Sequence, residues 1–342
     1  METHDDSDGA VTDALTDWLN EHVGGPVDPN YADYIDADEG GDAGAYEARC
    51  HEIHMDQPDW DKATASSLAH NGFAVLHLGH HCLSPGITSA CSTYASERMD
   101  FLFKCARALG LRPQHDVLRY SELCSRRAGG MRYDMRLWTA AHAEHDEPTT
   151  GQTFPECWSK LQTEVEVIVR PVLRQYLCER SNSSSSTAQE CDQKLFDPCH
   201  EPCIDSVGCV TALPGAPDQH FHPDGTAIGL VNVFVPLCPV GYENGPTELQ
   251  PGSHVWRETA FGSKPRWDER KTHPVSPVMP IPGGHLLLFD YRCYHRGLAN
   301  HSTSPRPIAY VAFSTRQGVS DSHNFPTDNE ASIIREAASE AG

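Results

Sequence analysis

The sequence predicts a mainly β protein with flanking helices, in which helical segments buttress a jelly roll. Short β-rich segments separated by Pro and Gly fill the chain from Val207 onward, whereas longer amphipathic segments come before that point. The sequence has no alternation of strand and helix patterns, no internal repeat and no Gly-rich phosphate loop. These features disfavour a doubly wound parallel sheet.

The first half of the chain predicts helices around two extended segments. The strongest helical pattern is at residues 161–177, where apolar residues recur on one face. Pro171 lies inside it and predicts a kink or a break, because proline cannot donate the helical hydrogen bond. A Ser-rich run at 181–187 is expected to be an exposed loop. The other predicted elements are, in order, a helix at 63–69, a strand at 72–78, a helix at 88–109 and an extended segment at 126–138.

The second half of the chain predicts the strands of the jelly roll. Each apolar run is short, and turn-forming Pro and Gly residues separate it from the next. This spacing is typical of antiparallel barrels and sandwiches. The predicted strands cover residues 209–213, 229–237, 285–289 and 308–314.

Length and charge predict the domain organisation. The chain has 342 residues and a formal net charge of −22, which disfavours nucleic acid as a partner because phosphates require a basic surface. Residues 2–42 contain no Lys or Arg, so residues 1–60 are expected to form an acidic, partly disordered arm. A single domain is expected over 61–330, with its jelly-roll core at about 205–318, and 331–342 are expected to form a C-terminal tail.

Neither membrane segments nor disulfide bonds are expected. No apolar run approaches the length of a membrane span, and the first residues are acidic, so a cytoplasmic protein without a signal peptide is predicted. The 13 cysteines are then expected to be free thiols. A structural zinc site is an alternative, although no paired C-x-x-C motif supports it. Its candidate ligands are Cys191, Cys199, His200, Cys203 and Cys209.

A metal-ligand pattern lies at the start of the β-rich half. Residues two apart in an extended chain face the same way, so His222 and Asp224 can point into one cavity. A second imidazole would complete a facial triad, which leaves the open coordination positions that a non-haem Fe(II) oxygenase requires. His295 is the candidate because it follows the predicted strand at 285–289. His220 is also near, but only His222 stands two residues before a carboxylate.

Arg306 lies eleven residues after His295, the candidate third ligand. A 2-oxoglutarate that chelates iron through its keto-acid end leaves its other carboxylate in need of a partner. Arginine suits this role, because its planar guanidinium can donate two hydrogen bonds to a carboxylate and stays charged when buried. Arg306 begins the predicted strand after His295, and that strand can run back beside the one before His295. Arg306 is therefore the candidate for co-substrate binding.

Several sequence blocks in the second half resemble the phytanoyl-CoA hydroxylase-like family of 2-oxoglutarate dioxygenases. The similarity covers about residues 205–326, with a weaker match at 72–75. The blocks occur in the order that the family shows. They are PGAPDQHFHPD at 214–224, ENGPT at 243–247, PGSH at 251–254, FDYR at 289–292, HRGLANHS at 295–302, RP at 306–307 and NFP at 324–326.

This resemblance implies a double-stranded β-helix of the cupin type and a set of cofactors. Fe(II) would be bound by His222, Asp224 and His295, and 2-oxoglutarate by Arg306, with O2 as the second co-substrate. By the same matching, two further residues, Gln219 and Thr247, would contact 2-oxoglutarate. The implied activity is hydroxylation of a small organic molecule with release of succinate and CO2. A carboxylate at position 224 favours hydroxylation over halogenation, which needs that coordination position for halide.

The sequence indicates less clearly which residues bind the substrate. Arg132 and Arg136 alternate along an extended segment, so both can face one side and pair with an acidic substrate. A surface ion pair with Asp134 or another carboxylate is the alternative. Two other functions remain open, namely a hydroxylase of protein side chains and a non-catalytic metal-binding β-barrel. The second is disfavoured because a simple metal binder has no need of Arg306. The sequence does not indicate an oligomeric state.

Overall fold

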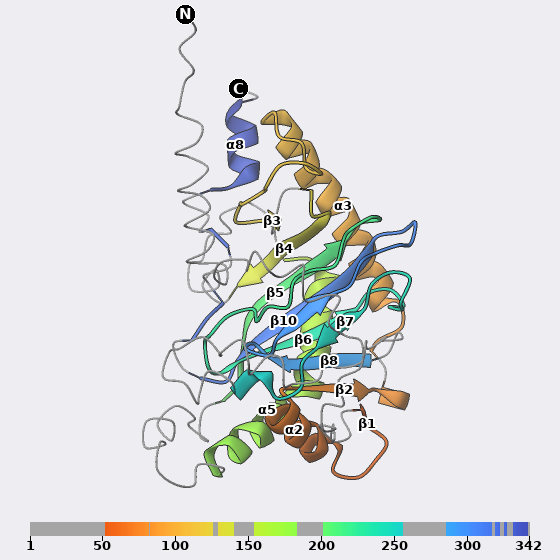
Figure 1. The fold of residues 1–342 in the computed structure, drawn as a ribbon, viewed down its shortest axis with the longest axis vertical. Coiled ribbons are helices and arrows are strands. Elements are labelled where there is room, and N and C mark those ends of the chain that lie inside the picture. The colour runs from red at the N-terminus through yellow and green to blue at the C-terminus, as the bar shows by residue number, and fades with distance from the viewer. Residues whose placement is uncertain are drawn as a thin grey trace, which may run out of the picture.

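The computed structural model describes residues 52–81, 83–125, 129–139, 154–182, 201–255, 285–316, 319–321, 325–326 and 331–340. Most of the acidic arm and of the Ser-rich run, together with Cys191, Cys199 and His200, lie outside these residues. The predicted fold class is confirmed. The described strands form one large and one small sheet, and helices lie against the large sheet (Figure 1).

Four α-helices lie within the described residues, and three of them occur where the sequence predicted helices. The fourth, near the C-terminus, was not predicted. It packs against α3, and its residue Ile333 is buried in the main core. The helices are α2 (Trp60–Asn71), α3 (Ile87–Ala108), α5 (Glu156–Asn182) and α8 (Ile333–Glu340), with short 3-10 turns η3 (Gly79–His81) and η4 (Ser253–Val255).

The large sheet has eight strands in the order β1-β2-β8-β6-β10-β5-β4-β3. All neighbouring pairs are antiparallel except β1 and β2. The small sheet consists of β7 and β9. The strands are β1 (Glu52–His54), β2 (Phe73–His77), β3 (Leu123–Ser125), β4 (Arg132–Thr139), β5 (Cys203–Ala212), β6 (Leu230–Pro236), β7 (Thr247–Leu249), β8 (His285–Asp290), β9 (His295–Gly297) and β10 (Arg306–Ser314).

Strands β2, β6, β8 and β10 are buried on both faces, which explains why they are nearly continuous apolar runs instead of alternating ones. In β8, Leu286 and Leu288 pack with the helices in the main core. Leu287 and Phe289 point the other way, into a smaller cluster inside the barrel that also contains Leu249 of the small sheet. A binding site on the inner face is therefore expected only where the side chains are polar instead of apolar.

The sequence predicted a kink or a break at Pro171, and helix α5 continues through it without a break. Proline removes the hydrogen bond to the carbonyl four residues earlier, which belongs to Val167. Val167 is 71% exposed, so water can bind that carbonyl and the break is not required. The opposite side of the helix carries buried Val165, Val169 and Leu173, and this packing stabilises the continuous helix.

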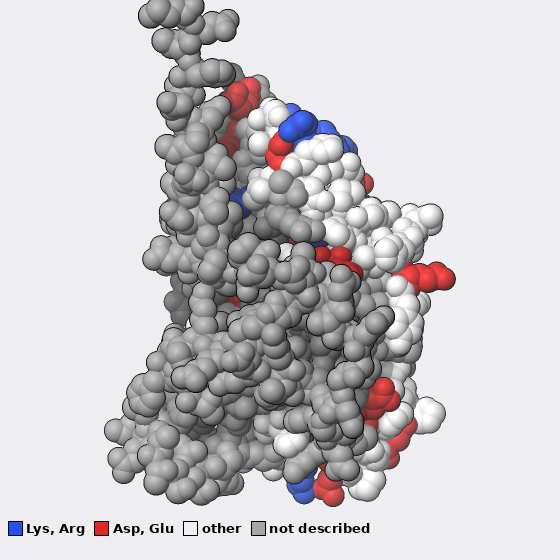
Figure 2. All heavy atoms as spheres, in the orientation of Figure 1, with Lys and Arg blue, Asp and Glu red and all other residues white. Residues whose placement is uncertain are grey.

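The described cysteines are all free thiols, as expected. Of the proposed zinc ligands within the described residues, Cys209 is buried in the core and Cys203 is exposed at the start of β5. Among the described helices, none has the length and apolarity needed to cross a membrane. On the described surface visible in Figure 2, acidic side chains are scattered and basic ones gather only at small spots.

Candidate metal centre

The small sheet brings two distant histidines together. His222 and His295 form an antiparallel bridge next to the β7–β9 pair. The amide of His222 donates to the carbonyl of His295 at 3.0 Å, and the reverse bond is 2.9 Å long. Two residues that exchange both hydrogen bonds have their side chains on the same face. The two imidazoles therefore lie side by side, with ring centroids 4.8 Å apart.

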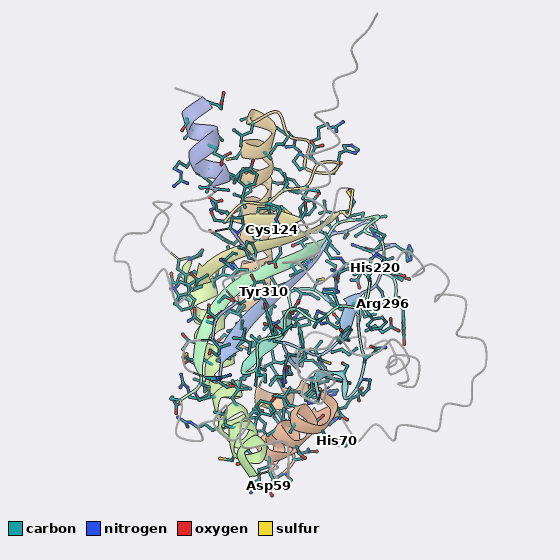
Figure 3. The ribbon with its side chains drawn as sticks, turned by 60° about the vertical axis from the view of Figure 1, so that its left-hand side comes forward. Asp59, His70, Cys124, His220, Arg296 and Tyr310 are labelled. Carbon is teal, nitrogen blue, oxygen red and sulfur yellow. The ribbon has the colours of Figure 1, made fainter. Side chains whose placement is uncertain are left out.

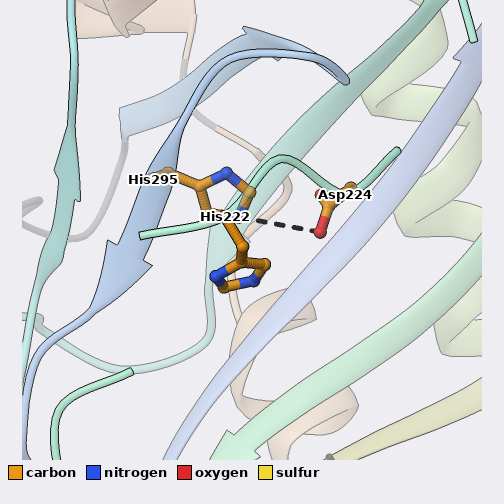
Figure 4. Close-up of side chains that lie close together, drawn as sticks. All are labelled: His222, Asp224 and His295. Carbon is orange, nitrogen blue, oxygen red and sulfur yellow. Dashed lines mark ion pairs between the residues drawn. The ribbon is translucent and has the colours of Figure 1, made fainter. Parts of the chain in front are cut away.

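Asp224 completes the group (Figure 4). One ligand atom from each of His222, Asp224 and His295 lies within 4.8 Å of the others, and no other such group of three was found among the described residues. Nε2 of His295 is 3.7 Å from Oδ1 of Asp224. The structure thus brings together all three residues that the sequence singled out as metal ligands.

Backbone carbonyls set the orientation of both imidazoles. Nδ1 of His222 is 2.7 Å from the carbonyl oxygen of His220, and Nδ1 of His295 is 3.0 Å from that of Cys293. A carbonyl can only accept, so each Nδ1 must carry the proton. In a neutral imidazole with this tautomer Nε2 keeps its lone pair, which is the form that a metal requires.

Asp224 is held by a residue that sequence reasoning missed. Nδ2 of Asn232 donates to Oδ2 of Asp224 at 2.7 Å, and the Asp224 amide donates to the carbonyl of Tyr291 at 3.0 Å. Oδ1 therefore remains on the side that faces His295. A signal was present in the sequence, because Asn232 is a polar residue inside the otherwise apolar strand β6.

A buried ion pair supports the loop before His295. Arg292 donates from Nε and Nη2 to the two carboxylate oxygens of Asp290, at 2.9 and 2.7 Å, and Tyr176 of α5 donates to Oδ2 at 2.9 Å. Burial acts to raise the pKa of Asp290, but the charge and hydrogen bonds of Arg292 outweigh it and hold the pKa at about 2. No role for the Arg292–Asp290 ion pair was predicted from the sequence.

The three candidate ligands line one side of a cavity that encloses about 530 Å³, part of it open to solvent. Arg306 lines the same cavity, and so do the apolar side chains of Val210, Phe234 and Ile308. These three apolar side chains come from three adjacent strands, because β10 pairs with both β5 and β6. The cavity therefore offers a charged group, an apolar wall and the three ligand side chains within one space.

Arg306 is buried, and none of the described carboxylates forms an ion pair with it. Its side chain is 1% exposed, and its Nε has no hydrogen-bond partner among the described residues. Burial lowers the pKa of Arg306 to about 10, so the guanidinium stays protonated at neutral pH. A buried, unpaired cation is costly to maintain, and an anion that enters the cavity would remove that cost.

Of the other predicted site residues, three line the cavity and one does not. Gln219, Thr247 and Arg132 all line the cavity. Arg136 is not among the lining residues. Its guanidinium donates to the carbonyl of Asp321 at 3.3 Å and lies 4.1 Å from the ring centroid of Phe325.

The opposite face of the small sheet carries a second polar contact. Arg296, which follows His295, donates to the carboxylate of Glu248 and lies 4.6 Å from the ring centroid of Phe221. Figure 3 shows Arg296 near His220, on the side of the molecule where the small sheet lies. This contact pairs β7 with β9 and leaves the cavity face to His295 and Gly297.

Residues 116–308, more than half of the chain, match the family described as phytanoyl-CoA dioxygenase (PhyH). This region contains the three candidate ligands and Arg306.

The structure is also similar to solved structures of low sequence identity. One is the non-haem α-ketoglutarate-dependent epimerase SnoN from nogalamycin biosynthesis, with 14% identity, a TM-score of 0.45, and coverage of 75% of this chain and 83% of that one. Another is AviO1 from Streptomyces viridochromogenes Tue57, with 18% identity, a TM-score of 0.44, and coverage of 74% and 94%. A third is EctD from S. alaskensis with bound Fe, with 16% identity, a TM-score of 0.44, and coverage of 74% and 75%.

Proposed function

This chain belongs to the phytanoyl-CoA dioxygenase family, and from that premise we propose that it is an Fe(II)- and 2-oxoglutarate-dependent dioxygenase that hydroxylates a small organic molecule. The proposed metal ligands are His222, Asp224 and His295. Arg306 is the proposed partner of the 2-oxoglutarate carboxylate that does not bind the metal, and Gln219 and Thr247 are further proposed contacts.

The donor set fits Fe(II). Two neutral imidazoles and one carboxylate are the ligands of non-haem Fe(II) oxygenases, whereas structural zinc sites are closed by four ligands and are often rich in cysteine. Both Nε2 atoms are available because both Nδ1 protons are donated to carbonyls. The second oxygen of Asp224 accepts from Asn232, which favours one bond from this carboxylate to the metal.

The proposal is carried by Arg306, which is buried in the same cavity as the three ligands and whose Nε has no hydrogen-bond partner among the described residues. A protein that only bound a metal would gain nothing from a buried cation at this place. A dicarboxylate that reaches from the metal to Arg306 would supply the missing counter-charge. The apolar side chains of Val210 and Ile308 would lie along its methylene groups, which need no hydrogen bonds.

Each part of the proposed reaction depends on particular residues of this chain. When bound, iron with 2-oxoglutarate supplies the activation of O2, coupled to oxidation of 2-oxoglutarate to succinate and CO2. The three ligands fix the position of the metal on one cavity wall, and Arg306 fixes the far end of the co-substrate. The apolar wall excludes water from that end and strengthens the ion pair. A substrate at the open side of the cavity would then be oriented towards the metal.

The test is a titration followed by a turnover assay. Protein with Fe(II) under anaerobic conditions should develop visible charge-transfer absorption as 2-oxoglutarate is added. After admission of O2, succinate release should be stimulated by one compound of a metabolite library. Stimulation by a peptide library alone would instead indicate a protein side-chain hydroxylase. Failure of the protein to bind Fe(II) and to consume 2-oxoglutarate under all these conditions would contradict the proposal.

A further inference from the structure

The side chain of Arg132 reaches from β4 to two other segments of the chain. It is 6% exposed, and its Nη2 lies within hydrogen-bonding distance of three backbone carbonyls. These are the carbonyls of Leu298 at 2.9 Å, Pro217 at 3.2 Å and Gly297 at 3.3 Å. Nη2 carries two N–H groups, so it can donate to two of these carbonyls at once or share one proton between two of them.

The three carbonyls belong to the segments that carry the two candidate histidine ligands. Pro217 precedes His222 by five residues, while Gly297 follows His295 by two. Several other hydrogen bonds also join the two segments, including the pair that His222 and His295 exchange. The amide of Gln219 donates to the carbonyl of Gly297 at 2.9 Å, and the amide of Gly297 donates to Oε1 of Gln219 at 3.0 Å. Arg132 thus ties both segments to the large sheet at the place where they meet.

The glycine at position 297 fits this arrangement. A Cβ added there would overlap Nη1 of Arg132 and would lie 2.8 Å from Oε1 of Gln219. Gly297 is not in the left-handed region, so its importance lies in the space it leaves and not in its backbone conformation. Any side chain at 297 would have to displace the Arg132 guanidinium from the carbonyls.

The sequence suggested that Arg132 and Arg136 act as a pair on an acidic substrate. In the structure the two guanidinium groups have separate environments, since that of Arg136 lies over Phe325 and outside the cavity lining. The contacts of Arg132 are to backbone atoms beside the candidate ligands, which favours a role in the geometry of the site.

We propose that Arg132 is a positioning residue that clasps the segments at 217–219 and 297–298 and so sets the spacing of the His222 and His295 imidazoles. This inference rests on the proposed function, because the spacing matters through the metal that the two imidazoles hold. Its removal is expected to weaken metal binding about 10- to 100-fold, as for other groups that orient metal ligands.

Two variants test the clasp in different ways. Arg132→Lys keeps the charge but ends in a shorter side chain without Nη2, and Gly297→Ala keeps Arg132 but displaces its guanidinium. The matched controls are Arg136→Lys, on the same face of β4, and Gly241→Ala, where an added Cβ meets nothing within 4 Å. The probe is Co(II), which has a visible spectrum that reports coordination geometry. Metal affinity, that spectrum and the unfolding temperature of the metal-free protein are measured for all five proteins.

We expect both test variants to bind Co(II) at least about tenfold more weakly and with an altered spectrum, whereas the controls match the wild type. A lower unfolding temperature alone does not alter the spectrum of the folded protein, so it cannot imitate this result. If Arg132→Lys does not fold, Gly297→Ala carries the test, because only the ends of the Arg132 and Gln219 side chains stand in its way and no backbone atom does.

Wild-type affinity and spectrum in the test variants would overturn the clasp and leave Arg132 as a candidate substrate contact. If the wild type binds neither Co(II) nor Fe(II), the proposed function has failed instead. The two failures are therefore distinguishable.

Discussion

His222 and His295 stand 73 positions apart in the sequence, yet their backbones exchange two hydrogen bonds, of 3.0 and 2.9 Å. The pairing places both imidazoles on one face of the small sheet, and the Nδ1 atom of each lies against a carbonyl of its own segment. The positions of the two Nε2 atoms are thus decided by backbone geometry before any metal binds. Such preorganisation reduces the cost of assembling the site.

The first prediction concerns the triad. Asp224→Ala or His295→Ala should abolish turnover and stable Fe(II) binding, because two remaining ligands cannot hold the metal against water. Metal content and 2-oxoglutarate consumption are measured on purified protein. His301→Ala, at an exposed position after β9, is the control and should bind the metal as the wild type does. Full activity in either triad variant would remove that residue from the metal centre.

The second prediction concerns Asn232. Replacing it with Leu removes the donor to Oδ2 of Asp224, so this carboxylate loses its fixed orientation. Fe(II) affinity should fall about 10- to 100-fold. The matched control is Asn244→Leu, which removes an amide that donates to the Pro239 carbonyl in an outer turn. Equal metal affinity in the two variants would show that Asn232 does not orient the ligand.

The third prediction separates co-substrate binding from metal binding. Arg306→Lys retains the charge but loses the two-pronged contact, so the KM for 2-oxoglutarate should rise about tenfold or more. Arg306→Ala should raise it further, by roughly 100-fold, since a carboxylate would then be buried without a partner. Fe(II) binding, measured without 2-oxoglutarate, should remain. An unchanged 2-oxoglutarate dependence in both variants would assign this role to another basic residue.

The fourth prediction concerns the pH dependence of stability. The pKa of Asp290 is about 2 in the folded protein, below its ordinary value of 3.8. A lowered folded pKa means that this group stabilises the fold fully above pH 4 to 5 and loses that contribution as the pH falls towards 2. The contribution is about 2 kcal/mol. Roughly half of it should be lost between pH 5 and pH 3, and this loss is measured as the change in the free energy of unfolding in urea.

Asp290→Asn tests the same group by mutation. It leaves Arg292 buried without its carboxylate and should destabilise the protein by about 3–5 kcal/mol at neutral pH. The part of the acid sensitivity that comes from Asp290 should also disappear. A variant with the same slope of stability against pH as the wild type would show that other carboxylates cause the loss.

The fifth prediction concerns Gly208 of β5. An added Cβ would overlap the hydroxyl of Tyr310 and lie 2.5 Å from the carbonyl oxygen of Met135, which is backbone and cannot easily move. Gly208→Ala should therefore destabilise the protein by about 1–3 kcal/mol. Gly241→Ala is the matched control, because the space around it is open. Equal urea midpoints for the two variants would contradict the close approach of Tyr310.

The local sequence pattern was sufficient to predict the strands that consist of long apolar runs. The apolar runs of β2, β6, β8 and β10 were found because strands buried on both faces need apolar residues at every position. The short strands β1, β3, β7 and β9 have three residues each and were not predicted. A three-residue strand has too few side chains to show a period, and its pairing depends on partners far away in the sequence.

The sequence alone determined which residue types were available for the metal centre. The spacing of His222 and Asp224, the position of His295 after a strand and the Arg306 that follows identified four residues, and the structure brings them into one cavity. These residues could be found because the chemistry of a facial triad demands particular side chains in a particular order.

Only the tertiary structure decided how each of these residues is held and which of the other candidates join them. The partnership of Asn232 with Asp224, the contacts of Arg132 with three carbonyls and the separation of Arg136 from the cavity all depend on strand pairing. Arg132 and Arg136 lie on the same strand, β4, but the atoms around each guanidinium decide which contacts it makes. Those atoms come from segments that are distant in the sequence, and only folding brings them close.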